Sequence, residues 1–89
     1  MEQRLWPVDV ISLSSASGDI RPLRIRATEG FDEMVIGNVC EILSTRESRT
    51  LGAEYQSFLC RVRSAKTVIV LELKYFVGSH CWYLSQPGM

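Results

Sequence analysis

YQSFLCRVRSAKTVIVLELKYFV, residues 55–77, is the stretch that decides the fold of this 89-residue chain. Within 55–63 every second residue from 58 to 62 is apolar, and within 67–77 every second residue from 69 to 75 is apolar, with charged residues at 61, 63, 72 and 74 on the opposite face. This is the period of a strand with one buried face. Three residues separate the two runs, so they are predicted to form an antiparallel hairpin. Together with Trp82, its inward side chains make up the predicted core: Phe58, Cys60, Val62, Ile69, Leu71 and Leu73.

The segments that flank the hairpin predict further short strands, bounded by turn-forming Gly, Ser and Asp. These strands are expected at Val8–Leu13, Ile20–Thr28 and Cys81–Ser85. Residues 33–44 favour a strand because they are rich in Val and Ile and because Gly37 weakens a helix interior. One short helix capped by Asp32 is the alternative there. The expected fold is therefore all-β or mainly β, a small antiparallel barrel or sandwich of six to seven short strands, with closure into a barrel favoured because it removes strand edges.

Length and composition indicate one globular domain spanning residues 1–89. An apolar fraction of 46% and a charged fraction of 22% are typical of folded rather than disordered chains. The formal net charge is zero, which argues against a non-specific nucleic-acid coat protein, because such binding needs a basic excess. No apolar signal segment opens the chain, and the longest aliphatic run, residues 68–71, is too short to span a bilayer. We therefore expect a cytoplasmic protein without a membrane partner.

Six segments, taken in order, resemble a group of small, uncharacterised, single-domain bacterial proteins. The segments are PVDVI at 7–11, PLRIR at 22–26, EIL at 41–43, FLCRV at 58–62, LELKY at 71–75 and WYL at 82–84. The resemblance covers Pro7 to Leu84 and is a pattern of strands rather than a catalytic motif. It implies a bacterial source and the β fold, and it carries over no functional residue.

Four arginines mark the candidate binding surface. Arg24 and Arg26 alternate with apolar residues at 23, 25 and 27, and Arg61 and Arg63 take the outward positions of the first hairpin strand. Each pair therefore projects to one side of its strand. Aromatic or apolar area beside them is expected from Tyr55, Leu59 and Tyr83. Guanidinium groups beside aromatic rings on a sheet are typical of single-strand nucleic-acid binders and of protein interfaces.

These arginines predict a non-catalytic binding module for an anionic partner, either a protein or a single-stranded nucleic acid, while a homodimer stays open. Like charges directly opposite on neighbouring strands destabilise a sheet, so a cluster of four cations calls for an external partner if the strands pair. The competing interpretation is a solvated face neutralised within the chain by Glu41, Glu47 or Glu72.

A catalytic or metal site is the alternative reading, with His80 at its centre. His80 would need a hydroxyl nucleophile and an orienting carboxylate to act as a general base, and no motif supplies them. Cys40, Cys60 and Cys81 lie about twenty residues apart rather than in the close pairs typical of structural zinc, so we expect reduced thiols packed in the core. The sequence thus predicts no enzyme, metal or cofactor, with a small ligand-binding or enzymatic barrel using His80 as the alternative.

Overall fold

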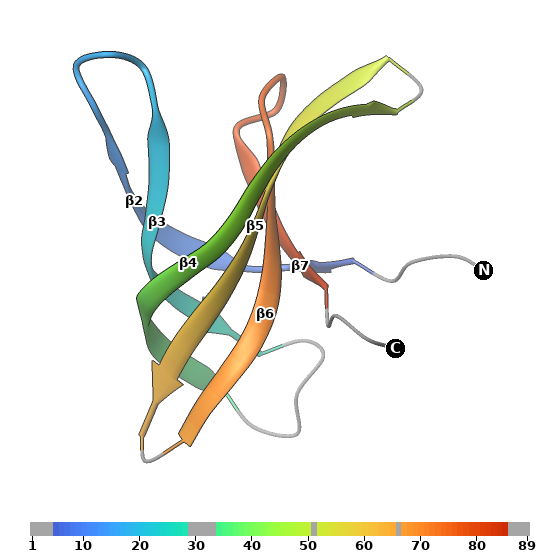
Figure 1. The fold of residues 1–89 in the computed structure, drawn as a ribbon. Helices are drawn as coiled ribbons and strands as arrows, with labels where there is room; N and C mark the ends of the chain where they lie inside the picture. The colour runs from blue at the N-terminus through green and yellow to red at the C-terminus, as the bar shows by residue number, and fades with distance from the viewer. Residues whose placement is uncertain (1–4, 29–33, 51, 66, 86–89) are drawn as a thin grey trace.

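The computed structural model describes residues 5–28, 34–50, 52–65 and 67–85 of the chain (Figure 1). Within these ranges the protein is all-β, with seven strands in one antiparallel sheet and no helix, so the predicted fold class is confirmed. The strands are β1 (Trp6–Pro7), β2 (Asp9–Ser14), β3 (Ile20–Ala27), β4 (Val35–Thr50), β5 (Ala53–Ser64), β6 (Thr67–Phe76) and β7 (Cys81–Ser85). The same ranges therefore hold no helix that could cross a membrane.

The sheet is curled into a half-barrel with the strand order β1-β7-β6-β5-β4-β3-β2 (Figure 1). Its two outermost strands, β1 and β2, are separated in the chain only by Val8. β1 pairs with β7 and β2 pairs with β3, and the Val8 N–H donates to the Trp82 carbonyl oxygen at 3.3 Å. The N-terminal segment therefore bridges the two sides of the sheet, which shields strand edges that would otherwise pair with other chains.

The predicted hairpin is confirmed as β5 and β6, which pair from Tyr55↔Phe76 to Ser64↔Thr67. β4 is longer than expected, with 16 residues, and it pairs with β5 over most of its length. The helix alternative is therefore wrong for the described part of 33–44. The proposed helix cap, Asp32, lies outside the described residues.

A close approach between β4 and β5 explains why this strand contains a glycine. Gly37 is buried opposite Ile25 of β3. A Cβ atom at Gly37 would overlap Cγ1 of Val62 and would lie 3.0 Å from the Arg63 carbonyl oxygen. The sheet thus requires a residue without a side chain here, where the sequence pattern had indicated only a poor helix former.

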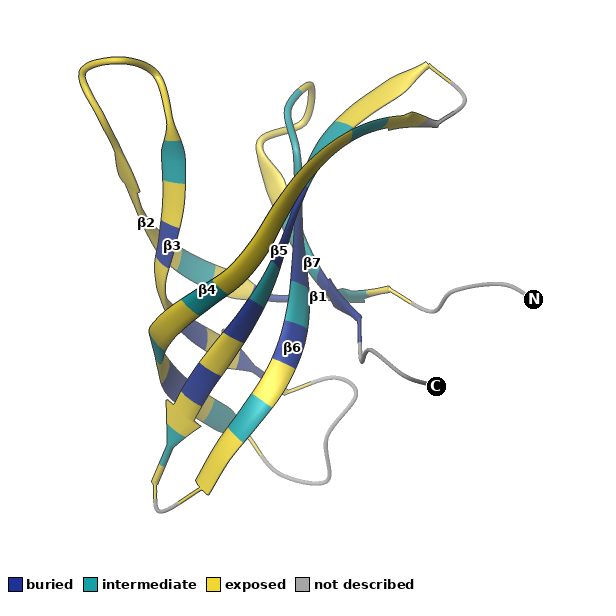
Figure 2. Cartoon of the chain, viewed as in Figure 1, coloured by how far each residue is buried: buried dark blue, intermediate teal, exposed yellow. Residues whose placement is uncertain are grey.

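The core is made by the inward residues of the curled sheet, and buried positions recur along β3, β5, β6 and β7 (Figure 2). Five of the seven predicted core residues are buried, namely Phe58, Cys60, Val62, Leu71 and Leu73. The remaining two, at 69 and 82, are half-buried and pack against the others. The core also takes in Val8, Ile25, Ala27 and Leu84.

β-bulges shift the register between neighbouring strands at three places in the described sheet. Between the pairs Ile11↔Arg24 and Ser12↔Pro22, one residue of β3, Leu23, has no partner. Pro22 is therefore buried, Leu23 is 40% exposed, and the prediction that Leu23 shares the inward face of β3 is wrong. The physical reason is that each extra residue in a bulge reverses the side-chain alternation beyond it. Two similar shifts in β4 leave Cys40 and Leu43 without a residue opposite them on β5, and both side chains are exposed.

Candidate functional site

The four predicted arginines lie on the outer face of β3 and β5, with β4 between these two strands. One row of aligned residues crosses five strands in the order Ile11, Arg24, Asn38, Arg63 and Val68. Arg24 and Arg63 therefore both have Asn38 as their direct neighbour rather than each other. The backbones of their strands, β3 and β5, lie two strand spacings apart, or about 10 Å. Like charges therefore do not stand directly opposite on paired strands here, because β4 separates them with a neutral residue.

Two of the arginines are neutralised within the chain. Arg26 donates from Nε and Nη2 to Oδ2 of Asp9, at 3.0 and 2.7 Å. Arg61 donates from Nη1 to Oε1 of Glu41 at 2.7 Å. Both pairs are solvent-exposed, so each contributes little to stability. Glu41 is thus one of the carboxylates expected to neutralise the patch.

The other two arginines, Arg24 and Arg63, make no ion pair with any residue that the structure describes, and both are exposed. Four arginines and the two carboxylates bound to them leave two positive charges on this part of the outer face. The prediction of an arginine-rich face is therefore correct for the placement of the side chains. Half of its charge is already compensated inside the chain.

Exposed aliphatic side chains surround these arginines. Ile11 is 60% exposed on β2, Ile36 is 45% exposed on β4, and Val68 and Val70 are 49% and 41% exposed on β6. By register, Ile36 is opposite Arg26, Val68 is opposite Arg63, and Val70 is opposite Arg61. We call this set the aliphatic–arginine face: Ile11, Arg24, Arg26, Ile36, Arg61, Arg63, Val68 and Val70.

Sequence reasoning missed the aliphatic half of this face, although one signal for it was present. In the run of residues 68–71 all four side chains are aliphatic, whereas a strand with one buried face should alternate. Ile69 and Leu71 point into the barrel, so Val68 and Val70 must point out. Such a run therefore indicates a strand that is apolar on both faces.

Tyr83 does not belong to the arginine patch. It lies on β7 opposite Lys74 of β6, whereas Arg61 lies opposite Val70 of β6. Lys74 and Val70 are four residues apart, which is about 13 Å along the strand. Its ring packs edge-on against Phe76, with the ring centroids 5.4 Å apart. Tyr83, predicted from the sequence to lie beside the arginines, is therefore placed in a separate aromatic cluster.

Tyr55 joins the same aromatic cluster rather than the arginines. Its ring centroid is 5.1 Å from that of Phe76, and Nζ of Lys74 lies 5.1 Å from the Tyr55 ring centroid. This cluster covers the outer side of β5–β7, which explains why Lys74 is only 8% exposed on a strand face expected to be solvated. Leu59, the third expected neighbour of the arginines, is half-buried. It lies two residues before Arg61 on β5, so both side chains project from the same face of the strand.

His80 lies in the turn between β6 and β7, where its φ of 58° falls in the left-handed region. Its Nδ1 shares a hydrogen bond of 2.9 Å with the Tyr75 hydroxyl. His80 also lines a depression of about 420 Å³ together with Asp9, but the Asp9 carboxylate is bound to Arg26. Tyr75 thus orients the imidazole.

The three cysteines occupy three different environments and form no disulfide. Cys60 is fully buried, and burial raises the pKa of its thiol from 9.0 to about 11. Cys40 and Cys81 are exposed, so the prediction that all three pack in the core is wrong for these two, which lie at a bulge and at a strand end. No group of three metal-ligating side chains occurs within the described ranges.

No family model, curated protein or solved structure was found to match this chain. The resemblance to small bacterial proteins therefore stays a prediction.

Proposed function

We propose that this domain is a non-catalytic protein-interaction module that binds an acidic partner through the aliphatic–arginine face. The observation that carries the proposal is the gathering of exposed aliphatic side chains from β2, β4 and β6 around Arg24 and Arg63, which have no ion pair within the described residues. Contiguous exposed apolar side chains typically mark binding surfaces. Arginine is enriched in protein interfaces, where its planar group binds carboxylates through paired hydrogen bonds.

The chemistry of the face favours a protein over a single-stranded nucleic acid. Single-strand binders stack bases on aromatic side chains, and the aliphatic–arginine face contains none. The expected aromatic neighbours, Tyr55 and Tyr83, are engaged in the separate cluster on β5–β7. Two uncompensated charges would also neutralise few phosphates, so the electrostatic part of nucleic-acid binding would be weak. Aliphatic area combined with carboxylates is instead what a protein partner offers.

Site-specific photo-crosslinking in cells of the source organism tests the proposal. A photoreactive phenylalanine analogue placed at Val68, on the face, should yield a discrete adduct with another protein. The same analogue at Ser17, which is exposed in the turn between β2 and β3, should not. Combining the probe with Arg24→Gln and Arg63→Gln should strongly reduce the adduct while leaving the melting temperature unchanged, since neither arginine has an ion pair to lose among the residues that the structure describes.

Three results would contradict the proposal. Equal adducts from the two probe positions would show that contact is not specific to the face. An adduct that persists in the double arginine variant would remove the role of charge. An adduct of two copies of the chain would identify a second copy as the occupant in place of an acidic partner.

A further inference from the structure

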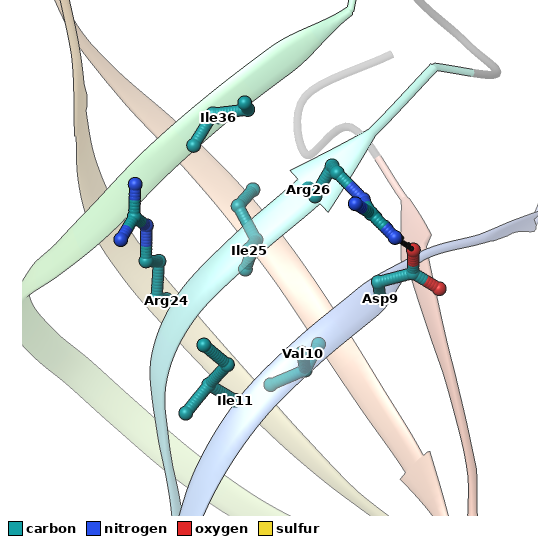
Figure 3. A pocket seen from close by; sticks show the side chains of 7 residues that line it. All are labelled: Asp9, Val10, Ile11, Arg24, Ile25, Arg26 and Ile36. Atoms are coloured by element: carbon teal, nitrogen blue, oxygen red, sulfur yellow. Dashed lines mark hydrogen bonds and ion pairs between the residues drawn. The ribbon is translucent and has the colours of Figure 1, made fainter.

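A small depression lies within the aliphatic–arginine face, across β2, β3 and β4 (Figure 3). Ile11 and Ile36 stand on its two sides, β3 runs between them at Ile25, and Arg24 and Arg26 lie to either side of Ile25. Its volume of about 330 Å³ is at the lower end of the range of about 300–1,000 Å³ that ligand pockets cover. The depression is therefore suited to one side chain rather than to a cofactor.

The two arginines of the depression have different roles because only one of them is committed. Arg26 turns toward β2, where two of its N–H groups bind a single oxygen of Asp9, so its aliphatic stem forms a wall (Figure 3). Arg24 points to the opposite side, away from Asp9 (Figure 3). Its guanidinium is exposed at the edge of the depression, and Arg63 lies beyond Asn38 in the same row.

We infer that this depression anchors one aliphatic side chain of an acidic protein segment, with carboxylates flanking that side chain bound by Arg24 and Arg63. The inference rests on the proposed function and specifies the partner chemistry. Isoleucine side chains on both sides match an aliphatic group, and two guanidinium groups whose strands lie about 10 Å apart match carboxylates of the same segment. A second copy of this chain is disfavoured as the occupant, because two such faces would bring net positive charge together.

Nuclear magnetic resonance titration of the ¹⁵N-labelled chain provides the test, with synthetic pentapeptides at millimolar concentration as probes. Acetyl-Glu-Leu-Glu-Leu-Glu-amide should shift the backbone amide signals of Ile11, Arg24 and Ile36. The matched acetyl-Gln-Leu-Gln-Leu-Gln-amide should bind at least about fivefold more weakly, since it lacks the charges that an exposed ion pair needs. Oligothymidylate of five nucleotides should leave these signals unmoved.

Two variants of equal charge change separate a specific site from general attraction. Arg24→Gln should weaken binding of the acidic peptide by about threefold to fivefold. Arg46 is an exposed arginine of β4 that lies eight residues after Asn38, away from the depression. Arg46→Gln should therefore leave binding unchanged. A third variant, Ile36→Ser, should reduce binding of both peptides, because it removes one side of the depression.

The inference is overturned if the acidic peptide causes no shifts, binds no better than its amide counterpart, or is weakened equally by Arg46→Gln. Shifts at the same residues with oligothymidylate would assign the face to nucleic acid instead. Its failure is distinguishable from failure of the proposed function. A specific crosslink from Val68 without peptide binding at the depression would keep the interaction module but move its anchor elsewhere on the face.

Discussion

Replacing Gly37 by alanine should destabilise the protein through one side-chain overlap. At Gly37 the strand β4 lies so close to β5 that an added Cβ would meet Cγ1 of Val62 and the Arg63 carbonyl oxygen. Val62 is fully buried and β-branched, so it has little freedom to move aside. Relief therefore requires either a shift of the strands or a change in the core.

The expected magnitude combines two opposing effects. Forcing an extra methyl group into a packed core costs about 1–3 kcal/mol. Replacing glycine where the backbone tolerates alanine returns about 0.4–1 kcal/mol by restricting the unfolded chain. Gly37→Ala should thus lower the free energy of unfolding by about 1–2 kcal/mol, which corresponds to a fall in melting temperature of about 4–16 °C for a domain of this size.

A double-mutant cycle shows whether the overlap with Val62 is the cause. Val62→Ala alone removes two methyl equivalents at about 0.8 kcal/mol each and leaves a cavity, for a total loss of about 2 kcal/mol. In the double variant the alanine at 37 occupies space that Val62 vacated. The combined loss should therefore be smaller than the sum of the two single losses by about 1 kcal/mol or more.

Equilibrium urea unfolding followed by tryptophan fluorescence measures these changes, because Trp82 packs on Phe58 with ring centroids 5.7 Å apart. Gly78→Ala is the matched control, since a Cβ there would have no atom within 4 Å, and its stability should stay equal or rise slightly. A Gly37→Ala variant as stable as the natural chain, or strictly additive losses in the double variant, would refute the packing argument.

Three further predictions follow from burial and charge. Leu71→Ala should lower the free energy of unfolding by about 2–5 kcal/mol in the same assay, because Leu71 is buried. Val70→Ala, one residue away on the outer face, should change it by at most about 0.5 kcal/mol. Similar losses in the two variants would mean that the register of β6 is wrong. Because burial raises the pKa of Cys60 in the folded state, the unfolded chain loses that thiol proton at a lower pH, and the free energy of unfolding should fall as the pH rises from about 9 to 11. Cys60→Val should abolish this part of the pH dependence. An unchanged dependence in the variant would exclude Cys60 as its source. Glu41→Gln should lower stability by less than about 1 kcal/mol, since its ion pair with Arg61 is exposed, and calorimetry showing a larger loss would mean that this pair supports the fold.

The strands were predictable because the signals that define them are local. Alternation within β5 and β6, and the short connection between them, predict a hairpin without knowledge of any other element. Pro22 is a local signal for the bulge at Leu23, because proline within a sheet is confined to edges and bulges, but it does not mark which residue loses its partner. Nothing in the residues around Cys40 marks the bulge there. As a result the sequence correctly indicated that Ile25 and Ala27 point inward, and it placed Leu23 on the wrong side.

The candidate site shows the same division. Alternation placed the four arginines on outward positions, which is a property of single strands. It left open that Arg26 would meet Asp9, that Arg61 would meet Glu41, and that Arg24 would be left without an ion pair among the described residues. Those outcomes depend on which strands are neighbours.

The amino-acid sequence by itself determined the all-β class, most strand boundaries and the inward face of the central hairpin, since each follows from side-chain spacing over a few residues. Only the tertiary structure decided the strand order, which inserts β4 between Arg24 and Arg63 and surrounds them with aliphatic side chains from three other strands. The physical reason is that cross-strand contacts join residues far apart in the chain. Their register is set by the packing of the whole sheet, including the close approach at Gly37, and not by any local pattern.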